Sequence, residues 1–302
     1  MRALTPADDN LHTPTSDDMF WTETAWFACS VPERKLTLFT YPVFRANQNI
    51  CSSGVYVWDD TAQANHEILY SHNFWHLPMP TDLTCMHLPS GLSYDVIEPL
   101  QKYRVRYASD DVNVDLTYDG LIPPQLSQKE DHLDQPCRVT GMIDLFGEKI
   151  AVDGYEIRDK SWHIRSDHPL KVADDIANGS YTYAIAGDTS FLARTVGANK
   201  NATTVYGGFL VRDGIVSPLT SGKRTVARSP GGLGNRVELE AVDAMGRTLK
   251  AVGLTVNRFA VQSTPAITAW ISGTTWDVNG QSIWGEDQEW AAGSDRKARR
   301  FD

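Results

Sequence analysis

The sequence predicts an all-β protein made of two similar antiparallel domains, each a barrel or a sandwich. Short alternating or apolar segments follow one another along the chain, and residues 112–118 alternate strictly between apolar and polar. Asp-Gly and Asn-Gly pairs, which tight hairpins prefer, recur at positions 119, 153, 178, 213 and 279. Stretches with the helical period of about 3.6 residues are nearly absent. Antiparallel sheet with one solvated face is therefore the expected structure.

The expected strands divide between the two halves of the chain. In the first half they are residues 36–41, 55–58, 68–70, 103–107 and 112–118. In the second half they are residues 181–185, 205–211, 237–242 and 249–254. The glycine-rich residues 230–235 look superficially like a phosphate-binding loop. No strand-to-helix transition and no Lys-Ser or Lys-Thr pair follows them, so we predict a hairpin loop.

Three internal echoes predict that one β domain has been duplicated. Residues 118–124 resemble residues 212–218, and residues 144–150 resemble residues 243–249, in the same order along the chain. The pattern Asp-x-x-Trp also recurs, from Asp159 to Trp162 and from Asp287 to Trp290.

From these echoes we place a first domain at residues 20–168 and a second at residues 169–302. The boundary is expected near residues 165–175, where Pro169 interrupts the strands. Residues 1–19 are polar and contain proline, so we expect a loosely held, flexible arm before the first domain.

Composition limits the classes of function. The chain has 302 residues, of which 41% are hydrophobic and 22% charged, as in ordinary globular proteins. Its net charge of −10 argues against a nucleic-acid partner, because phosphate binding needs clustered Lys and Arg. The basic residues 296–300 are expected to form a solvated terminus.

We expect a cytoplasmic protein with reduced thiols. The start of the chain lacks the apolar core of a secretory signal, and no apolar run approaches the length of a membrane span. The four cysteines, Cys29, Cys51, Cys85 and Cys137, form no Cys-x-x-Cys pair, so redox or zinc chemistry is not expected.

Residues 158–167 concentrate ionisable and aromatic side chains. An Asp-Gly pair at 153–154 lies between apolar segments, so we expect a rigid hairpin to present Asp159 and Trp162 at its end. Asp159 then has two interpretations. It is either an acid of tuned strength that faces a pocket, or half of an Arg–Asp pair that only joins two strands.

The motif Arg158-Asp159-x-Ser161-Trp162-x-x-Arg165 is similar to a signature of the carotenoid hydratase and AttH-like superfamily. Residues 20–27 resemble the opening motif of these proteins, residues 98–103 and 135–141 resemble their middle, and residues 284–289 resemble their closing motif. The resemblance implies two lipocalin-like β domains. Two positions depart from the signature: Lys160 stands where the superfamily has His, and His163 stands where it has Gly.

The resemblance and the aromatic residues together predict an acid–base enzyme that needs no cofactor. We expect a lyase, hydratase, isomerase or cyclase that acts on an isoprenoid- or steroid-like molecule in a pocket between the domains. Asp159 is the first candidate for the acid, with His163, Glu23 and Glu286 as its partners. The expected substrate-binding residues are Trp162, Trp21, Trp26, Trp75, Tyr155, Trp284 and Arg158.

The alternative is a lipocalin-like protein that binds a lipophilic ligand without converting it. In both cases the expected partner is a hydrophobic small molecule, without stable insertion into a membrane, and a homodimer is left open. No metal is expected. His72 and His76 share one face of a predicted strand, but no third ligand can be identified for them.

Overall fold

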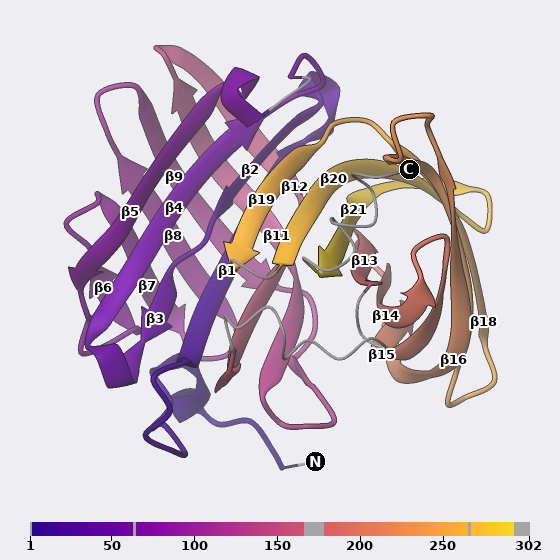
Figure 1. Ribbon diagram of the computed structural model, residues 1–302, viewed down its shortest axis with the longest axis horizontal. Coiled ribbons are helices and arrows are strands. Elements are labelled where there is room, and N and C mark those ends of the chain that lie inside the picture. The colour runs from indigo at the N-terminus through magenta and orange to yellow at the C-terminus, as the bar shows by residue number, and fades with distance from the viewer. Residues whose placement is uncertain (1, 63–64, 166–177, 265–266, 293–302) are drawn as a thin grey trace. The chain divides into compact units, whose positions relative to one another are not determined.

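The computed structural model describes residues 2–62, 65–165, 178–264 and 267–292 (Figure 1). The expected domain boundary near residues 165–175 and the basic residues 296–300 lie outside the described residues. The described chain consists of strands and four short 3-10 helices and has no α-helix, which confirms the all-β prediction. It forms two compact units: residues 1–57 with 69–165, and residues 58–68 with 166–302.

The first unit holds three 3-10 helices, η1 (Pro6–Asp9), η2 (Pro32–Arg34) and η3 (Ala46–Gln48). Its strands are β1 (Trp21–Val31), β2 (Leu36–Thr40), β3 (Val43–Arg45), β4 (Ile50–Trp58), β5 (Tyr70–Pro78), β6 (Cys85–His87), β7 (Leu92–Glu98), β8 (Lys102–Ala108), β9 (Val112–Gly120), β10 (Gln125–Leu126), β11 (His132–Leu145) and β12 (Glu148–Ile164). The sheet order is β2-β4-β3-β1-β12-β11-β9-β8-β7-β6, with β5 beside β4 and β10 beside β11.

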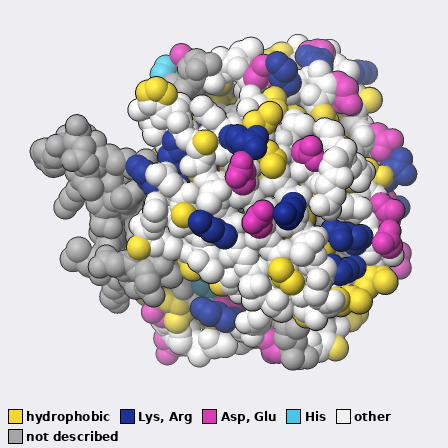
Figure 2. Space-filling view, turned by 90° about the vertical axis from the view of Figure 1, so that its right-hand side faces the viewer, with side chains coloured by type: hydrophobic (Ala, Val, Ile, Leu, Met, Phe, Trp, Pro, Cys, Tyr) yellow, Lys and Arg dark blue, Asp and Glu magenta, His cyan; other side chains and the backbone are white. Residues whose placement is uncertain are grey.

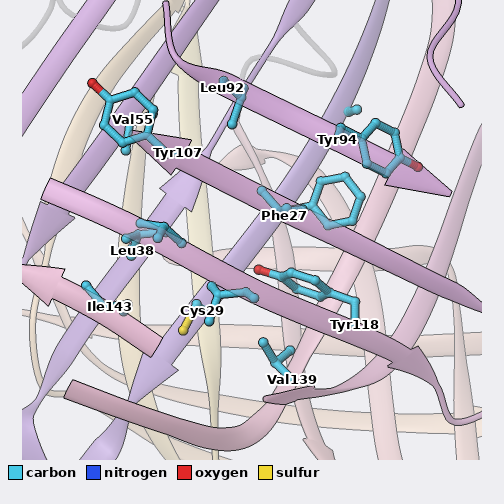
Figure 3. Packing of buried hydrophobic residues seen from close by; sticks show 14 of the residues in the cluster. Phe27, Cys29, Leu38, Val55, Leu92, Tyr94, Tyr107, Tyr118, Val139 and Ile143 are labelled. Atoms are coloured by element: carbon cyan, nitrogen blue, oxygen red, sulfur yellow. The ribbon is translucent and has the colours of Figure 1, made fainter. Parts of the chain in front are cut away.

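The core of the first unit is rich in aromatic side chains (Figure 3). The Phe27 ring from β1 lies 4.9 Å from the rings of Tyr94 and Tyr118. The buried hydroxyl of Tyr118 donates a hydrogen bond to the carbonyl of Ala28 at 2.7 Å. Aromatic rings therefore fill this part of the core, and the buried hydroxyl of Tyr118 has a hydrogen-bond partner.

The second unit is an eight-stranded closed barrel with one added strand. Its elements are η4 (Asn65–Glu67), β13 (Asn178–Ala186), β14 (Thr189–Asn199), β15 (Ala202–Arg212), β16 (Ile215–Arg228), β17 (Gly234–Asp243), β18 (Thr248–Thr255), β19 (Phe259–Thr264), β20 (Ile267–Val278) and β21 (Gln281–Ala292). The barrel closes because β18 pairs with both β17 and β20, while β19 pairs with β20. Trp58 belongs to this unit and donates a hydrogen bond to Asn257 at 3.0 Å.

Three of the predicted turns are wrong. Asp119 and Gly120 lie in strand β9 and pair with β11. Asp153 and Gly154 lie inside the 17-residue strand β12, so no hairpin presents Asp159. The ladder between β11 and β12 runs without interruption through both residues, and the exposed Asp153 pairs with Arg138 across it at 3.0 Å. The turn lies instead at Phe146-Gly147, where both residues have positive φ angles. Asn178 likewise begins strand β13.

The turns at Asp213-Gly214 and Asn279-Gly280 are as predicted, since all four residues have the positive φ angles that type I′ hairpins need. The loop at residues 230–235 also joins two paired strands, β16 and β17, as expected. The strand predicted at residues 68–70 is wrong, because β5 begins at Tyr70.

Some internal echoes in the sequence occupy equivalent positions in the two units, and others do not. In each unit the last strand lies between the first strand and the strand that precedes it: β12 lies between β1 and β11, and β21 between β13 and β20. Asp159 and Asp287 lie on these two last strands. The echo of residues 144–150 in residues 243–249, however, marks the β11–β12 hairpin in one unit and the β17–β18 hairpin in the other. That similarity reflects shared turn chemistry.

The surface carries charges of both signs. On the face drawn in Figure 2, Lys and Arg side chains are interspersed with Asp and Glu side chains. Exposed cross-strand ion pairs also occur among the described residues, such as Arg104 with Asp115 at 2.6 Å. Within the described ranges, no helix is both long and apolar enough to span a membrane.

Candidate active site on strand β12

Strand β12 carries two separate groups of functional side chains. It pairs in register with β1 on one side and with β11 on the other, so its side chains alternate between two faces of the sheet. We call one the Trp162 face, with Arg158, Lys160 and Trp162. We call the other the Asp159 face, with Asp159, Ser161 and His163. The expected convergence of Asp159 with Trp162 in one pocket is therefore wrong.

The Trp162 face holds a buried ion pair. Glu23 lies opposite Trp162 on β1, and its carboxylate pairs with the ammonium group of Lys160. Lys160 also donates to the carbonyl of Asn10 at 2.6 Å. His12 Nδ1 lies 2.9 Å from Glu23 Oε1, and the His12 ring stacks on Trp162 with centroids 3.8 Å apart. Burial alone would raise the pKa of Glu23, but the His12 hydrogen bond and the Lys160 charge lower it.

Arg158 is also paired on the Trp162 face, but not with Asp159. Its guanidinium donates to Asp9 at 2.7 Å and lies over the Tyr103 ring, 4.0 Å from the centroid. Asp9 is fully buried and also accepts from the backbone N–H of Leu100 at 2.7 Å. The prediction of a loosely held arm is therefore wrong for its first part, because buried charges hold that part in the first unit.

The Asp159 face begins with hydroxyl and aromatic groups from β1. Trp26 lies opposite Asp159 and is buried against Phe39, with ring centroids 4.2 Å apart. Ser161 is fully buried and lies 2.8 Å from the hydroxyl of Thr24. Arg165 donates to Ser161 Oγ at 2.6 Å. This face thus places an indole and a bound guanidinium near Asp159.

A second carboxylate lies directly across from Asp159. Asp134 on β11 pairs with Asp159 in the ladder and is fully buried. His132 Nε2 lies 2.9 Å from Asp134 Oδ1 and 4.0 Å from Asp159 Oδ2. Two carboxylates this close favour a shared proton or a cation between them. Asp134, Asp159 and His132 therefore form one group of neighbouring ionisable side chains.

His163 completes the Asp159 face. Burial, together with the positive charge of Arg165, lowers the pKa of His163 to about 4, so its imidazole is neutral at pH 7. Among the described residues, its buried Nδ1 atom has no hydrogen-bond partner. A neutral imidazole with an open ring nitrogen can donate or accept a proton.

The other predicted site residues are dispersed. Trp21 is buried against Trp162. Glu286 and Trp284 lie on β21 in the second unit, where Glu286 is fully buried and accepts from Gln288 at 2.8 Å. Two others are exposed: Trp75 is 70% exposed and Tyr155 38% exposed. Such exposure does not fit the dry aromatic wall that was expected for these two side chains.

A groove of about 540 Å³ lies elsewhere on the first unit. Its lining includes Arg2, Leu4, Leu100 and Leu126, and none of the described residues of the Asp159 face lines it. The candidate active site is therefore defined by its side-chain chemistry and not by this groove.

Two groups of three residues could hold a metal ion among the described residues. They are His132 with Asp134 and Asp159, and Cys85 with His87 and Asp95. His72 and His76 belong to neither group. His72 instead places its Nδ1 atom 2.8 Å from the hydroxyl of Tyr107.

Four residues that contribute to the two faces of β12 were not among the residues predicted from the sequence. Asp9 and His12 lie in a polar segment that resembles a solvated arm, and only the fold brings them to β12. His132 and Asp134 alternate with the apolar Leu133, so an alternating strand pattern was the one signal that could have placed them on the same face as Asp159.

The structure has the two-sheet, lipocalin-like fold of known proteins. It is similar to a crystal structure of a putative AttH protein from Nitrosomonas europaea, with 15% identity, 97% of each chain covered and a TM-score of 0.64. It is also similar to kievitone hydratase from Nectria haematococca, with 13% identity and a TM-score of 0.55 over 90% of this chain and 89% of that chain. No match was found among curated proteins.

These similarities confirm the predicted resemblance to AttH-like proteins at the level of the fold. The chain belongs to the family described as "Domain of unknown function (DUF7064)", whose model matches residues 5–290.

Proposed function

We propose that the protein is an acid–base enzyme, a lyase or hydratase or else an isomerase or cyclase, that acts on an unsaturated isoprenoid- or steroid-like molecule. The observation that carries this proposal is His163. It is half-buried, it is neutral because its pKa is about 4, and its buried Nδ1 atom has no partner in the described chain. A histidine held only for packing would satisfy both of its ring nitrogens.

Asp159 is the proposed acid. The neighbouring carboxylate of Asp134 favours a proton on the pair, and Asp159 is the more accessible of the two, with 16% of its side chain exposed against none for Asp134. The indole of Trp26 on the same face provides an apolar surface that can stabilise a developing cation.

The proposed reaction begins when Asp159 donates its proton to one carbon of a double bond, which leaves a cation on the adjacent carbon. In a hydration, water attacks that cation and His163 accepts the proton that the water releases, so H and OH have been added. In an isomerisation or cyclisation, His163 instead accepts a proton from another carbon. His163 then releases its proton to solvent, and Asp159 takes up a proton from solvent, so both groups return to their starting states.

The spacing of the two groups limits where the reacting atoms of the substrate can lie. Asp159 and His163 are four residues apart on one strand, so their Cα atoms are separated by roughly 13 Å. Their side chains cannot exchange a proton directly over that distance. The substrate carbon and the attacking water must therefore lie between them.

The comparisons support this class of function. One of the structurally similar proteins is by name a hydratase, and the fold similarity covers nearly the whole chain. Because the identity is 13%, the comparison supports the reaction class and not the substrate.

Deuterium transfer from solvent tests the proposal for any product in which a new C–H bond has formed. The purified protein would be incubated in D₂O with the lipids that copurify with it and with a panel of unsaturated isoprenoid alcohols and sterols. Mass spectrometry should then show carbon-bound deuterium in a substrate. Asp159→Asn and His163→Gln should each lower the rate by roughly 10²–10⁴-fold, as expected for loss of a general acid or base.

Asp153→Asn is the matched control, because Asp153 lies on the same strand but is exposed and paired with Arg138. It should keep the full rate. If Asp159→Asn and His163→Gln both fold and both keep that rate, the catalytic assignment is wrong. If lipids bind to the wild-type protein but none acquires deuterium, the non-catalytic binding protein is the correct alternative.

A further inference from the structure

The hairpin of β6 and β7 presents three potential metal ligands on one face. Cys85 and His87 are two residues apart on β6, both exposed, while Met86 between them is buried. Asp95 on β7 lies directly opposite Cys85 in the ladder. Their ligand atoms all lie within 4.8 Å of one another. The hairpin therefore brings a thiol, an imidazole and a carboxylate together.

The distance between the first two ligand atoms fits a tetrahedral ion. Cys85 Sγ lies 3.6 Å from His87 Nε2, a distance that also allows a hydrogen bond to sulfur. Zinc bonds of about 2.3 Å to sulfur and 2.0–2.1 Å to nitrogen, at a tetrahedral angle, separate the two ligand atoms by ~3.6 Å. The group around Asp159 does not fit this criterion. His132 Nε2 lies 2.9 Å from Asp134 Oδ1, which is a hydrogen bond and shorter than the ~3.4 Å between two zinc-bound N and O atoms.

Neighbouring groups orient two of the three ligands. His87 Nδ1 lies 3.0 Å from the hydroxyl of Ser93, the residue opposite His87 in the ladder. When Nδ1–H donates to that hydroxyl, the lone pair of Nε2 faces Cys85, as a metal ligand requires. Arg106 donates to Asp95 Oδ2 at 2.6 Å and holds that carboxylate on the same face.

We propose that Cys85, His87 and Asp95 form a surface zinc site with an open fourth position. A thiolate, an imidazole and a carboxylate together favour Zn²⁺ over Mg²⁺ or Ca²⁺, which prefer oxygen ligands alone. The site is separate from the proposed acid–base function and does not depend on it. β6 lies at one end of the strand order of the first unit, so an ion here would join this terminal strand to β7.

Cobalt provides the sharpest test, because Co²⁺ bound to a thiolate in a tetrahedral site absorbs in the near-ultraviolet and visible range. The full chain, without an affinity tag and after treatment with a chelator, would be titrated with Co²⁺ and then with Zn²⁺. We expect one equivalent of Co²⁺ to produce the thiolate band and Zn²⁺ to remove it. Cys85→Ser should abolish the band, and Ser93→Ala should weaken binding by roughly 10–100-fold.

His76→Ala is the control, since His76 is an exposed histidine on strand β5 that belongs to neither ligand group. It should bind Co²⁺ as the wild type does. If the wild type produces no thiolate band, or if both Cys85→Ser and Asp95→Asn keep it unchanged, the site does not exist. Because all three ligands lie on a hairpin surface, circular dichroism should show that these variants remain folded.

Discussion

The two faces of β12 share one backbone but differ in how their charged and ionisable side chains are arranged. On the Trp162 face, Arg158 and Lys160 each have a carboxylate partner from another segment, Asp9 and Glu23. On the Asp159 face, two carboxylates lie opposite each other and a neutral His163 has an open nitrogen. The first arrangement stabilises the fold, whereas the second retains groups that can transfer protons. The difference shows that neighbours in a strand sequence can belong to sites with different roles.

The largest effect is expected from Lys160→Met on the Trp162 face. This change leaves the carboxylate of Glu23 buried without its ammonium partner. Loss of one member of a buried pair costs about 3–5 kcal/mol, which urea unfolding would measure. The double variant Glu23→Leu/Lys160→Met should recover much of that loss, because it removes both charges.

Lys149→Met is the control for that comparison, since Lys149 lies on the same strand and is exposed. Its effect should stay within about 0.5 kcal/mol. Equal stability of the Lys160→Met and Lys149→Met variants would show that the Trp162 face does not depend on its ion pair.

A smaller effect is expected from pH on the Asp159 face. The pKa of His163 is about 4 in the folded chain, below its ordinary value of 6.5, so the unfolded chain binds more protons between these values. Stability should therefore fall as the pH falls from 6.5 towards 4, by about 3 kcal/mol in total. His163→Gln should remove this part of the pH dependence. A wild type and variant with parallel profiles from pH 7 to pH 4 would contradict the lowered pKa of His163.

The sequence predicts the sheets and some of their turns because these depend on local chemistry. Asn279 and Gly280 adopt positive φ angles that these residue types tolerate at low cost. Asp153 and Gly154 have the same chemistry but lie in a strand, because the ladder with β11 continues past them. A local preference of this kind is weaker than a long run of cross-strand hydrogen bonds, and the sequence alone does not show where that run ends.

The site is less predictable because its partners come from distant segments. The sequence indicates that Asp159 and His163 matter, and the strand period places them on one face. It does not show that Asp9, 149 positions before Arg158, neutralises that arginine. The polar residues in the first part of the chain show no periodicity that would distinguish a buried segment from a solvated arm. Contacts of this kind follow only from the folded sheet.

A moderate effect is expected from His12→Ala, which tests how the arm is held on the Trp162 face. The change removes the ring stacked on Trp162 and the hydrogen bond to Glu23, but leaves the Lys160 pair in place. The expected loss is about 1–2 kcal/mol. His66→Ala, at a histidine that is 84% exposed on its side chain, is the control and should have no measurable effect. Equal losses for the two variants would mean that the arm contributes nothing to the stability of the first unit.

The smallest effect is expected from Trp75→Ser. Trp75 was predicted to bind substrate, but 70% of it is exposed on β5, whereas Trp26 beside Asp159 is 4% exposed. Removing an exposed indole should change the free energy of unfolding by less than about 0.5 kcal/mol and leave deuterium transfer unchanged. Trp26→Leu should instead lower both stability and deuterium transfer, because the indole packs against Phe39 and lies opposite the proposed acid. If Trp75→Ser lowers deuterium transfer while Trp26→Leu does not, the substrate binds on β5, and the Asp159 face is not where the reaction occurs.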